Sequence, residues 1–423
     1  MSERTISKNE STALLASSLV VAAAALLVTV IVARAVSPAQ ASEFVVFWGL
    51  LFGVYGVLTG IQQEVTRAVG SVHAGYGNQV QGARVLPVAL IFGAVAALLM
   101  LALGFLGGTD LLPSHTLSAF ALIALAAFLY SGQSASMGAA AGSKRWYLFA
   151  AINGGDAAFR LIFVVAALAF AGLVPFYLAT TVSVLLWLLL GILPAGRRNL
   201  AERADVSAFQ LARKMGFTVV SSSANAVLVT GFPVLLQLAM AESSEAGSAG
   251  REGLLAAVVF AITVTRSPIM IPLQAFQGVA ISAFLKQQHR PLAALKKPVA
   301  ALMGIAALGG LLAWLIGPWL FALVFGSKYD GLLEGWFLGT LTFASGFMAV
   351  LMITGAATLA VNRHIAYTLG WVVAALVAIA LMFVPQPVEI KTLLALYGGP
   401  LAGLLIHFTA LRHHAKNYRS DRV

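Results

Sequence analysis

Apolar stretches of the length that a bilayer-spanning helix needs recur along the whole chain. The first runs from Ala13 to Ala33, and about 20 consecutive apolar residues are enough to cross the hydrocarbon core of a membrane. Inside lipid every backbone N–H and C=O must be paired within the protein, so only helices and closed barrels can span it. The alternation of apolar and polar residues that marks barrel strands is missing. The sequence therefore predicts an all-α polytopic membrane protein.

The composition supports many such helices. The chain has 423 residues, of which 60% are hydrophobic and only 10% are charged, and a soluble protein could not bury that much apolar surface. About twelve transmembrane helices fit, with expected ranges 13–33, 44–61, 85–106, 117–140, 147–171, 173–193, 215–239, 253–284, 299–325, 332–361, 365–384 and 391–411.

Positive charges gather in the connections on one side of the predicted membrane. The net charge is +11, and most of the 26 Lys and Arg residues fall on the same side as both termini. Cytoplasmic loops carry the excess of Lys and Arg, so we expect both termini to be cytoplasmic. Charge spread through short loops also argues against nucleic acid as a partner. The chain has no cysteine, which excludes disulfides and thiolate metal sites.

A basic, polar stretch near the middle of the chain separates two sets of six predicted helices. We expect an N-terminal six-helix bundle at 1–194, a cytoplasmic basic linker at 195–214, and a C-terminal six-helix bundle with a short cytoplasmic tail at 215–423. An even number of helices in each half gives both halves the same orientation, as in transporters built from parallel repeats.

The external connections are too short to fold as a catalytic domain. The largest are 107–115, 241–252, 326–331 and 385–391. The chain also lacks a phosphate-binding P-loop and a cluster of metal-ligand residues. We therefore expect a protein that is not an enzyme and that uses neither a cofactor nor a bound metal.

The predicted span 253–284 carries Arg266 near its middle. A guanidinium at membrane depth costs about 2.5–3.5 kcal/mol on insertion scales, so it needs a polar cavity or a partner. Two helix-breaking prolines and two glutamines follow it: Pro268, Pro272, Gln274 and Gln277. This pattern favours a kinked helix whose arginine meets an anionic substrate group. The alternative is a structural pair with a carboxylate on a neighbouring helix.

The predicted span 147–171 carries Asn153, Asp156 and Arg160. Spacings of three and four residues place all three side chains on one helical face, where Asp156 and Arg160 can form an i,i+4 ion pair. The pair is either a structural zipper that lowers the cost of insertion, or a switch that opens when substrate phosphate or a proton competes for one partner.

Three further polar residues are weaker candidates. Glu64 and Arg67 lie one turn apart near the cytoplasmic end of the second span, where a solvated interfacial pair and a lining of an inward-open mouth are both possible interpretations. Asn225 lies in the seventh span. Counting the buried charges, Arg160 and Arg266 outnumber Asp156, so the predicted cavity favours an anionic head group over a cation.

Several longer phrases resemble a known group of transporters. They are the first hairpin ARAVSPAQASEFVVFWGLLFGVYGVLTGIQQEVTRAV, the eighth-span phrase TRSPIMIPLQAFQGVAISAF, and LVFGSKYDGLLEGWFLGTLTFASG before the tenth span. Together with the span count and the central linker, they make the chain resemble the multidrug/oligosaccharidyl-lipid/polysaccharide (MOP) exporter superfamily, and within it the Wzx-type polysaccharide flippases.

The resemblance implies two six-helix bundles around a central cavity that work by alternating access. It implies a bacterial cytoplasmic membrane protein that moves polyprenyl-pyrophosphate-linked oligosaccharides to the outer leaflet, with Arg266 at the position where relatives engage the pyrophosphate. Its partners would be the lipid-linked glycan, membrane lipids, and glycosyltransferases or a glycan polymerase. Two other hypotheses stay open: a proton- or sodium-coupled multidrug or cation antiporter that uses Asp156, and a non-transporting scaffold of a glycan assembly complex.

Overall fold

The computed structural model describes residues 7–74, 82–241, 253–266, 284, 291–361 and 363–420. In these ranges the chain is helical, and the nearest approach to a sheet is one isolated antiparallel bridge between Arg84 and Arg203. Ten of the described helices are long and apolar enough to cross a membrane. The expected fold class, an all-α polytopic membrane protein, is confirmed. The chain divides into two compact units, Met1–Val234 and Leu235–Val423.

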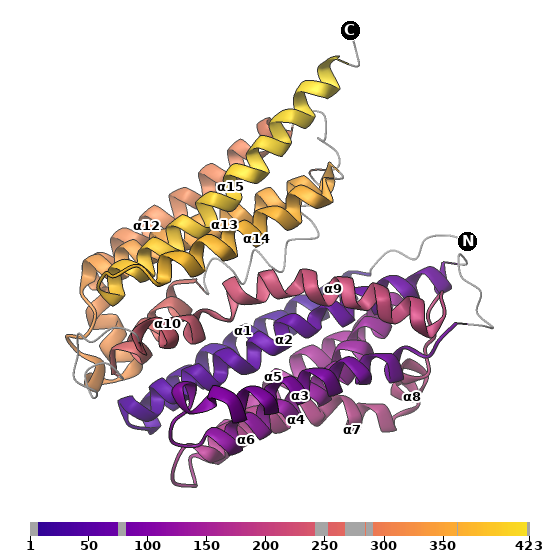
Figure 1. The fold of residues 1–423 in the computed structure, drawn as a ribbon, viewed down its shortest axis with the longest axis horizontal. Helices are drawn as coiled ribbons and strands as arrows, with labels where there is room; N and C mark the ends of the chain where they lie inside the picture. The colour runs from indigo at the N-terminus through magenta and orange to yellow at the C-terminus, as the bar shows by residue number, and fades with distance from the viewer. Residues whose placement is uncertain are drawn as a thin grey trace. The chain divides into compact units, whose positions relative to one another are not determined.

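The Met1–Val234 unit contains a bundle of long helices that run alongside one another (Figure 1). In chain order its helices are α1 (Lys8–Ala35), α2 (Pro38–His73), α3 (Val85–Leu111), α4 (Thr116–Gly142), α5 (Trp146–Ala167), α6 (Val174–Val182), the 3-10 turn η1 (Ser183–Leu185), α7 (Leu186–Ile192), α8 (Pro194–Leu200) and α9 (Ala208–Val229). The short α10 (Phe232–Ala241) follows.

The first two helices begin at capping boxes that the sequence encodes. The Ser7 hydroxyl accepts from the Glu10 N–H at 3.2 Å, and the Glu10 carboxylate accepts from the Ser7 N–H at 2.9 Å. Ser37 and Gln40 repeat the arrangement at the start of α2, where Pro38 occupies the first helical position. These side chains satisfy backbone donors that a helix start leaves unpaired, so the turn at Val36–Ser37 separates two helices.

Helix α2 packs against both α4 and α9. Glycines permit these close approaches: an added Cβ at Gly138 would stand 2.7 Å from the Gln62 carbonyl oxygen, and Gly60 lies directly against the backbone of Thr218 and Val219. The Thr218 hydroxyl donates to the Gly60 carbonyl at 2.7 Å. Small residues at helix crossings are typical of membrane bundles, and here they join α9 to the N-terminal helices.

The observed unit boundary therefore differs from the expected one. The sequence prediction ends the N-terminal half at 194 and begins the C-terminal half at 215, whereas the compact N-terminal unit continues to Val234. The predicted seventh span, 215–239, is also divided, because α9 ends at Val229 and α10 starts at Phe232. Pro233 has no N–H to donate and cannot continue the α9 hydrogen-bond pattern.

The predicted linker 195–214 is folded against the N-terminal unit. Its Ala204 N–H donates to the Ala83 carbonyl at 2.8 Å, and the Ala83 N–H donates to the Val206 carbonyl at 3.0 Å. Asn199 is fully buried and donates from Nδ2 to the Ser136 carbonyl at 2.8 Å. The linker is thus joined to the start of α3 and to α4 by backbone and side-chain bonds.

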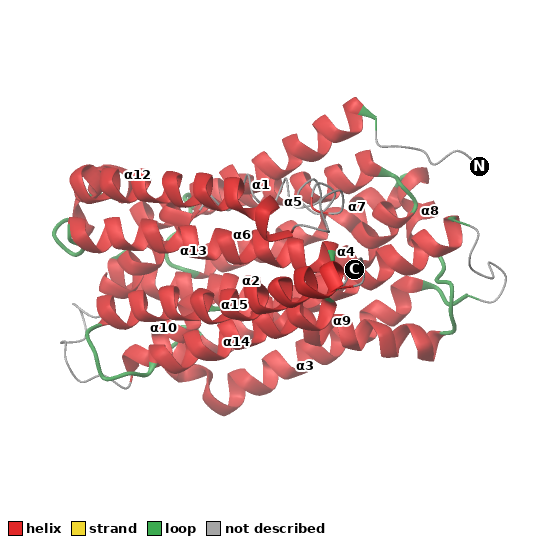
Figure 2. Ribbon diagram, turned by 90° about the horizontal axis from the view of Figure 1, so that it is seen from above, coloured by secondary structure: helices red, strands yellow, loops and turns green. Residues whose placement is uncertain are grey.

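The Leu235–Val423 unit is built on α12 (Pro291–Phe325), the 3-10 turn η2 (Ser327–Tyr329), α13 (Gly335–Ala360), α14 (His364–Met382) and α15 (Val388–Ser420). Figure 2 shows the helices by secondary structure from a second direction. Helix α13 is the most buried, with contacts to α12, α14 and α15. His407 on α15 is fully buried and bonded to Thr354 at 3.0 Å.

Candidate functional site

The polar face of α5 lies inside the N-terminal unit. The Asp156 and Arg160 residues are only 6% and 4% exposed, and the Arg160 Nη2 donates to the Asp156 Oδ2. One turn earlier, Asn153 Nδ2 lies 3.5 Å from the Ser17 hydroxyl on α1. An added Cβ at Gly154 would stand 3.0 Å from the Ser17 Cβ, so this glycine allows α1 to approach the polar face. The predicted i,i+4 pair is confirmed.

Aromatic rings and a hydroxyl complete the surroundings of the Arg160 guanidinium. Its central carbon lies 4.8 Å from the ring centre of Phe52 and 6.0 Å from that of Trp48, both on α2. Its Nε donates to the Ser183 hydroxyl at 3.3 Å. A cation over an aromatic face is stabilised by the ring quadrupole, and the effect grows when water is absent. The guanidinium is thus held by contacts from α2, α5 and η1.

Two buried oxygens at this centre, one in the pair itself and one next to it, have no hydrogen-bond partner. They are Asp156 Oδ1 and the hydroxyl of Tyr55. The Tyr55 ring stacks on Tyr130 of α4 with centroids 3.9 Å apart and an interplanar angle of 8°. Buried polar atoms are normally satisfied, so each exception requires an explanation, and a functional role is one of them. Asp156 Oδ1 can accept a proton or a hydrogen-bond donor while Oδ2 keeps the hydrogen bond that it accepts from Arg160.

The arrangement combines one buried cation, one buried anion and an aromatic wall. Arginine presents a planar fork that matches carboxylate and phosphate oxygens equally well. A phosphate group that reached this centre could therefore replace Asp156 as the partner of Arg160. Among the described residues, no three His, Asp or Glu side chains come together as a metal site.

Glu64 and Arg67 form the second predicted pair, at the far end of α2. The Arg67 Nε lies 2.9 Å from Glu64 Oε2, and its Nη1 lies 2.9 Å from Asp205 Oδ2 of the linker. Burial acts to raise the pKa of the Asp205 carboxyl, but the hydrogen bonds and charge of Arg67 outweigh it and lower that pKa below its usual value. Glu64 and Arg67 thus form a partly exposed ion pair, and Asp205, from a distant part of the chain, is a second partner of Arg67.

A second cluster next to this pair also ties the linker to the bundle. The Arg145 Nη2 donates to Glu202 Oε1 at 2.8 Å, and His73 Nε2 lies 3.1 Å from Glu202 Oε2. Arg203 donates to the Gly82 carbonyl at 2.8 Å. We call these contacts, together with Glu64, Arg67 and Asp205, the linker clamp. They bond linker residues to the N-terminal unit and are separate from the Asp156–Arg160 centre.

The remaining predicted residues fall at the edge of, or outside, the described parts. Arg266 is half-buried at the end of the helix Gly253–Arg266. That helix belongs to the C-terminal unit, where Phe260 stacks on Phe325 of α12 at 4.9 Å. Gln274 and Gln277 lie outside the described residues, as does the side chain of Asn225. Their proposed roles stay predictions.

Residues that the sequence prediction missed contribute most of the surroundings of the Arg160 guanidinium. Trp48, Phe52 and Tyr55 follow one another at spacings of four and three residues, which places three aromatic rings on one face of α2. That spacing is visible in the sequence. The contributions of Tyr130 and Ser183 have no such local signal, because they depend on how α4 and η1 pack against α2 and α5.

Solved structures with the same fold define the class. The chain matches an inward-facing multidrug resistance MATE family transporter of the MOP superfamily with a TM-score of 0.68 and 14% identity, covering 93% of this chain and 95% of that one. It matches the lipid II flippase MurJ, in an inward closed conformation, with a TM-score of 0.68 and 10% identity over 97% and 91% of the two chains. The protein has the fold of MOP superfamily transporters, as expected from the sequence. The narrower resemblance to Wzx-type flippases stays a prediction.

A sequence relative defines the family more narrowly. The chain is 35% identical over 387 residues to the uncharacterized protein Rv1510 of Mycobacterium tuberculosis, covering 90% of this chain and 86% of the relative. It belongs to the same protein family as Rv1510. No protein-family model matches the chain.

Proposed function

We propose that the protein is a flippase that moves a polyprenyl-pyrophosphate-linked oligosaccharide across the bacterial cytoplasmic membrane by alternating access. The observation that carries the proposal is the buried guanidinium of Arg160, 4% exposed, within a MOP-type fold. A buried arginine in a membrane bundle is costly, and such residues mark substrate pathways. The similarity of fold to a lipid II flippase supports a substrate with a pyrophosphate head group.

The Asp156–Arg160 pair suggests how the head group is recognised. Asp156 pairs with Arg160 and neutralises its charge. A pyrophosphate oxygen that bonds the guanidinium leaves Asp156 as an uncompensated buried anion, which is strongly unfavourable. Protonation at Asp156 Oδ1, which has no partner, removes that charge. Substrate binding is thereby linked to uptake of a proton, and release of the head group restores the pair.

Arg266 is the second proposed contact for the anionic head group. It lies on the C-terminal unit, whereas Arg160 lies on the N-terminal unit. In alternating access the two halves of a transporter move about a substrate site. Glycosyltransferases that build the head group and a polymerase that consumes it are the protein partners that this function implies.

The test is transfer of a labelled polyprenyl-pyrophosphate oligosaccharide across vesicles that contain the purified full-length protein. We expect Arg160→Lys to lower the transfer rate about tenfold, because an ammonium lacks the planar two-point fork of a guanidinium. Arg266→Ala should lower it at least as much. Arg198→Lys, at an exposed arginine of α8, is the matched control and should transfer at the normal rate. Normal transfer by folded Arg160→Lys and Arg266→Ala proteins would overturn the proposal.

A second candidate function is proton-coupled efflux of drugs or cations. The observation in its favour is the buried Asp156 with one free oxygen, which can exchange a proton for a cationic substrate. In that case Asp156→Asn abolishes efflux of a cationic dye driven by a pH gradient and leaves transfer of the glycan lipid unchanged. The flippase proposal expects the opposite: no dye efflux by the unmodified protein, and reduced glycan transfer by Asp156→Asn.

A further inference from the structure

Three buried polar atoms without a hydrogen-bond partner lie together near the start of α2. They are Oε1 of Glu43 on α2, Nδ1 of His115 at the start of α4, and the hydroxyl oxygen of Tyr177 on α6. The Glu43 Oε1 and His115 Nδ1 atoms are 3.9 Å apart, and the His115 ring lies edge-on to that of Tyr177, with centroids 6.4 Å apart. All three elements belong to the N-terminal unit. The group lies at the opposite end of α2 from Arg67 and the linker clamp.

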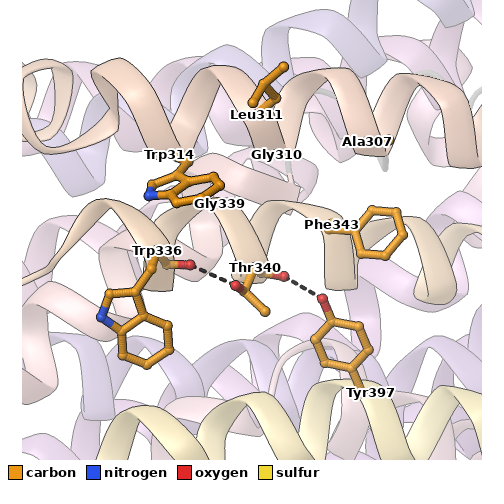
Figure 3. A pocket seen from close by; sticks show the side chains of 9 residues that line it. All are labelled: Ala307, Gly310, Leu311, Trp314, Trp336, Gly339, Thr340, Phe343 and Tyr397. Atoms are coloured by element: carbon orange, nitrogen blue, oxygen red, sulfur yellow. Dashed lines mark hydrogen bonds between the residues drawn. The ribbon is translucent and has the colours of Figure 1, made fainter.

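A tyrosine in the C-terminal unit shows the arrangement that polar groups ordinarily reach inside a protein. The Tyr397 hydroxyl donates to the Thr340 carbonyl at 2.8 Å, and the Thr340 hydroxyl donates to the Trp336 carbonyl at 2.6 Å (Figure 3). Burial of a polar atom without such a bond is costly. Three unsatisfied atoms in one place therefore require a common explanation.

Aromatic rings pack beside Glu43 and keep water from it. The Tyr177 ring is fully buried and stacks on Phe47 at 4.0 Å and on Phe44 at 6.4 Å. Both phenylalanines are 0% exposed, and the Glu43 side chain is 6% exposed. These surroundings offer no counter-charge, so a carboxylate anion at Glu43 is strongly disfavoured unless a cation lies next to it.

His115 is held at the start of α4 with one face of its ring toward solvent. Its carbonyl accepts from the Ala119 N–H at 2.9 Å and from the Ser118 hydroxyl at 3.0 Å. The imidazole side chain is 34% exposed, although Nδ1 itself is buried. Protons from water can therefore reach the ring, while Nδ1 is the ring atom next to Glu43.

The elements around His115 contribute four other ionisable groups. They are Glu43 from α2, Tyr177 from α6, Asp110 from the last turn of α3 and Arg34 from the last turn of α1. Asp110 and Arg34 are exposed, so water and salt screen their charges. The dipole of α4 opposes a positive charge on His115, but this effect is smaller than the cost of a buried carboxylate without a counter-charge.

The group lacks the ligands of an ordinary metal site. Zinc sites in proteins use three or four side chains, and within the described parts of the chain no third His, Asp or Glu joins Glu43 and His115. A proton needs only one base next to one carboxylate. The base is His115, which is the ionisable nitrogen within 4 Å of the Glu43 carboxylate among the described residues.

We propose that Glu43 and His115 form a proton-binding site, and that the bound proton links the start of α2 to the start of α4. When the neutral imidazole takes up a proton, both ring nitrogens carry hydrogen, and Nδ1–H donates to Glu43 Oε1. The buried anion then has its counter-charge, and two of the three unsatisfied atoms gain a partner. Loss of the proton removes the positive charge and weakens the link. Histidine ordinarily exchanges its proton between about pH 5 and pH 8, so the link responds to pH in the physiological range.

The test is a double-variant cycle on the unfolding equilibrium of the full-length protein in detergent. His115→Gln, Glu43→Gln and the double variant are compared with the unmodified protein at about pH 5.5 and at about pH 8. The coupling is the factor by which the double variant departs from the product of the two single effects. We expect a coupling of about tenfold at the lower pH and less than about twofold at the higher pH, because the ion pair exists only while His115 is charged.

His73 and Glu202 provide the matched control at the other end of the unit. Their atoms are closer, at 3.1 Å, but 43% of the His73 side chain is exposed. Water screens such a pair, so the cycle of His73→Gln and Glu202→Gln should show a coupling of about twofold or less at both pH values.

Two results of the cycle would overturn the proposal. A Glu43–His115 coupling that is equal at both pH values, or larger at the higher one, would show that a proton plays no part. No coupling at the lower pH would show that the two residues do not form the pair. If a glutamine variant does not fold, hydrogen exchange of the unmodified protein decides. After correction for intrinsic rates, protection of segment 112–119 should be several-fold greater at about pH 5.5 than at about pH 8, and equal protection contradicts the proton-dependent link.

Discussion

Two arginine–carboxylate clusters in the N-terminal unit use the same chemical groups but differ in how far water reaches the arginine. The Asp156–Arg160 side chains are 8% and 5% exposed and come from one helix. The Arg67 side chain is 43% exposed and joins Glu64 on its own helix to Asp205, which lies 138 residues away along the chain. Water reaches Arg67, although Glu64 is only 5% and Asp205 only 13% exposed, and it is excluded from both partners of the first cluster. Formation of the buried pair therefore costs desolvation of both partners, whereas Arg67 keeps part of its contact with water.

The difference in solvent access predicts a large difference in the cost of breaking each pair. Replacement of Arg160 by Leu should lower the free energy of unfolding by about 3–5 kcal/mol, because Asp156 becomes an unpaired buried charge. The double variant Asp156→Leu, Arg160→Leu should be far less destabilised, since no charge remains. Denaturant unfolding of the detergent-solubilised proteins measures both. If the double variant proves as unstable as the single one, packing rather than charge determines the stability of this centre.

Removal of Arg67 should have a smaller effect that depends on salt. We expect Arg67→Ala to cost about 1–2 kcal/mol in dilute buffer, because two partly buried carboxylates lose their common donor. The loss should shrink in 1 M salt, where the Debye length is about 3 Å, whereas the loss from Arg160→Leu should not change. Denaturant unfolding of both variants, in dilute buffer and in 1 M salt, measures how each loss depends on salt. A salt-independent Arg67→Ala effect would mean that water and salt are excluded from the Glu64–Arg67–Asp205 cluster as they are from the Asp156–Arg160 pair.

Asp205 should make the stability of the linker clamp depend on pH. The pKa of its carboxyl is lowered in the folded protein, by the hydrogen bonds and charge of Arg67 acting against burial. Its contribution is therefore fully present above about pH 3.9, the unfolded-state value, and is lost as the pH falls through the lower folded-state value. Thermal unfolding between pH 6 and pH 3 should show a steeper loss for the unmodified protein than for Asp205→Asn. Identical pH profiles for the unmodified protein and Asp205→Asn would show that Asp205 does not contribute to the stability of the linker clamp.

The smallest effect is expected at the edge of the clamp. His73 lies 3.1 Å from Glu202, with 43% of its side chain exposed, and Glu202 keeps its bond to Arg145 if His73 is removed. His73→Ala should therefore change the free energy of unfolding by only a few tenths of a kcal/mol. Arg145→Ala should cost more, because it removes the bonds that Arg145 donates to Glu202 and to Asn199 Oδ1. If the two variants rank in the reverse order, His73 is the principal partner of Glu202.

The sequence predicted those features of the fold that depend on local patterns. The apolar runs predicted the helices long enough to span a membrane. The expected starts at 13 and 44 missed the capping residues Ser7 and Ser37, after which α1 and α2 begin. The spacing of Asp156 and Arg160 gave their ion pair. Each of these needs only residues within a few turns of one another, so periodicity and helix geometry are sufficient.

Contacts between distant segments could not be predicted in the same way. The composition of 195–214 predicted a basic, polar linker. In the structure, however, Asn199 is fully buried against α4, and Asp205 is bonded to Arg67. Nothing in the local sequence pairs these residues with partners from 63 to 138 positions away. The same holds for Tyr130 and Ser183 beside the buried pair, whose positions depend on how separate helices pack.

The pairing of the linker with the start of α3 has a consequence for how the chain can be cut. Proteases require an extended peptide that can leave the surface, and exposed polar segments are their usual targets. The segment Ala204–Val206 instead exchanges backbone hydrogen bonds with Ala83, and Arg203 is bonded to Gly82. Cleavage here therefore requires that these hydrogen bonds open at the same time. The point at which composition divides the protein in two is thus a poor place to split it for expression as separate fragments.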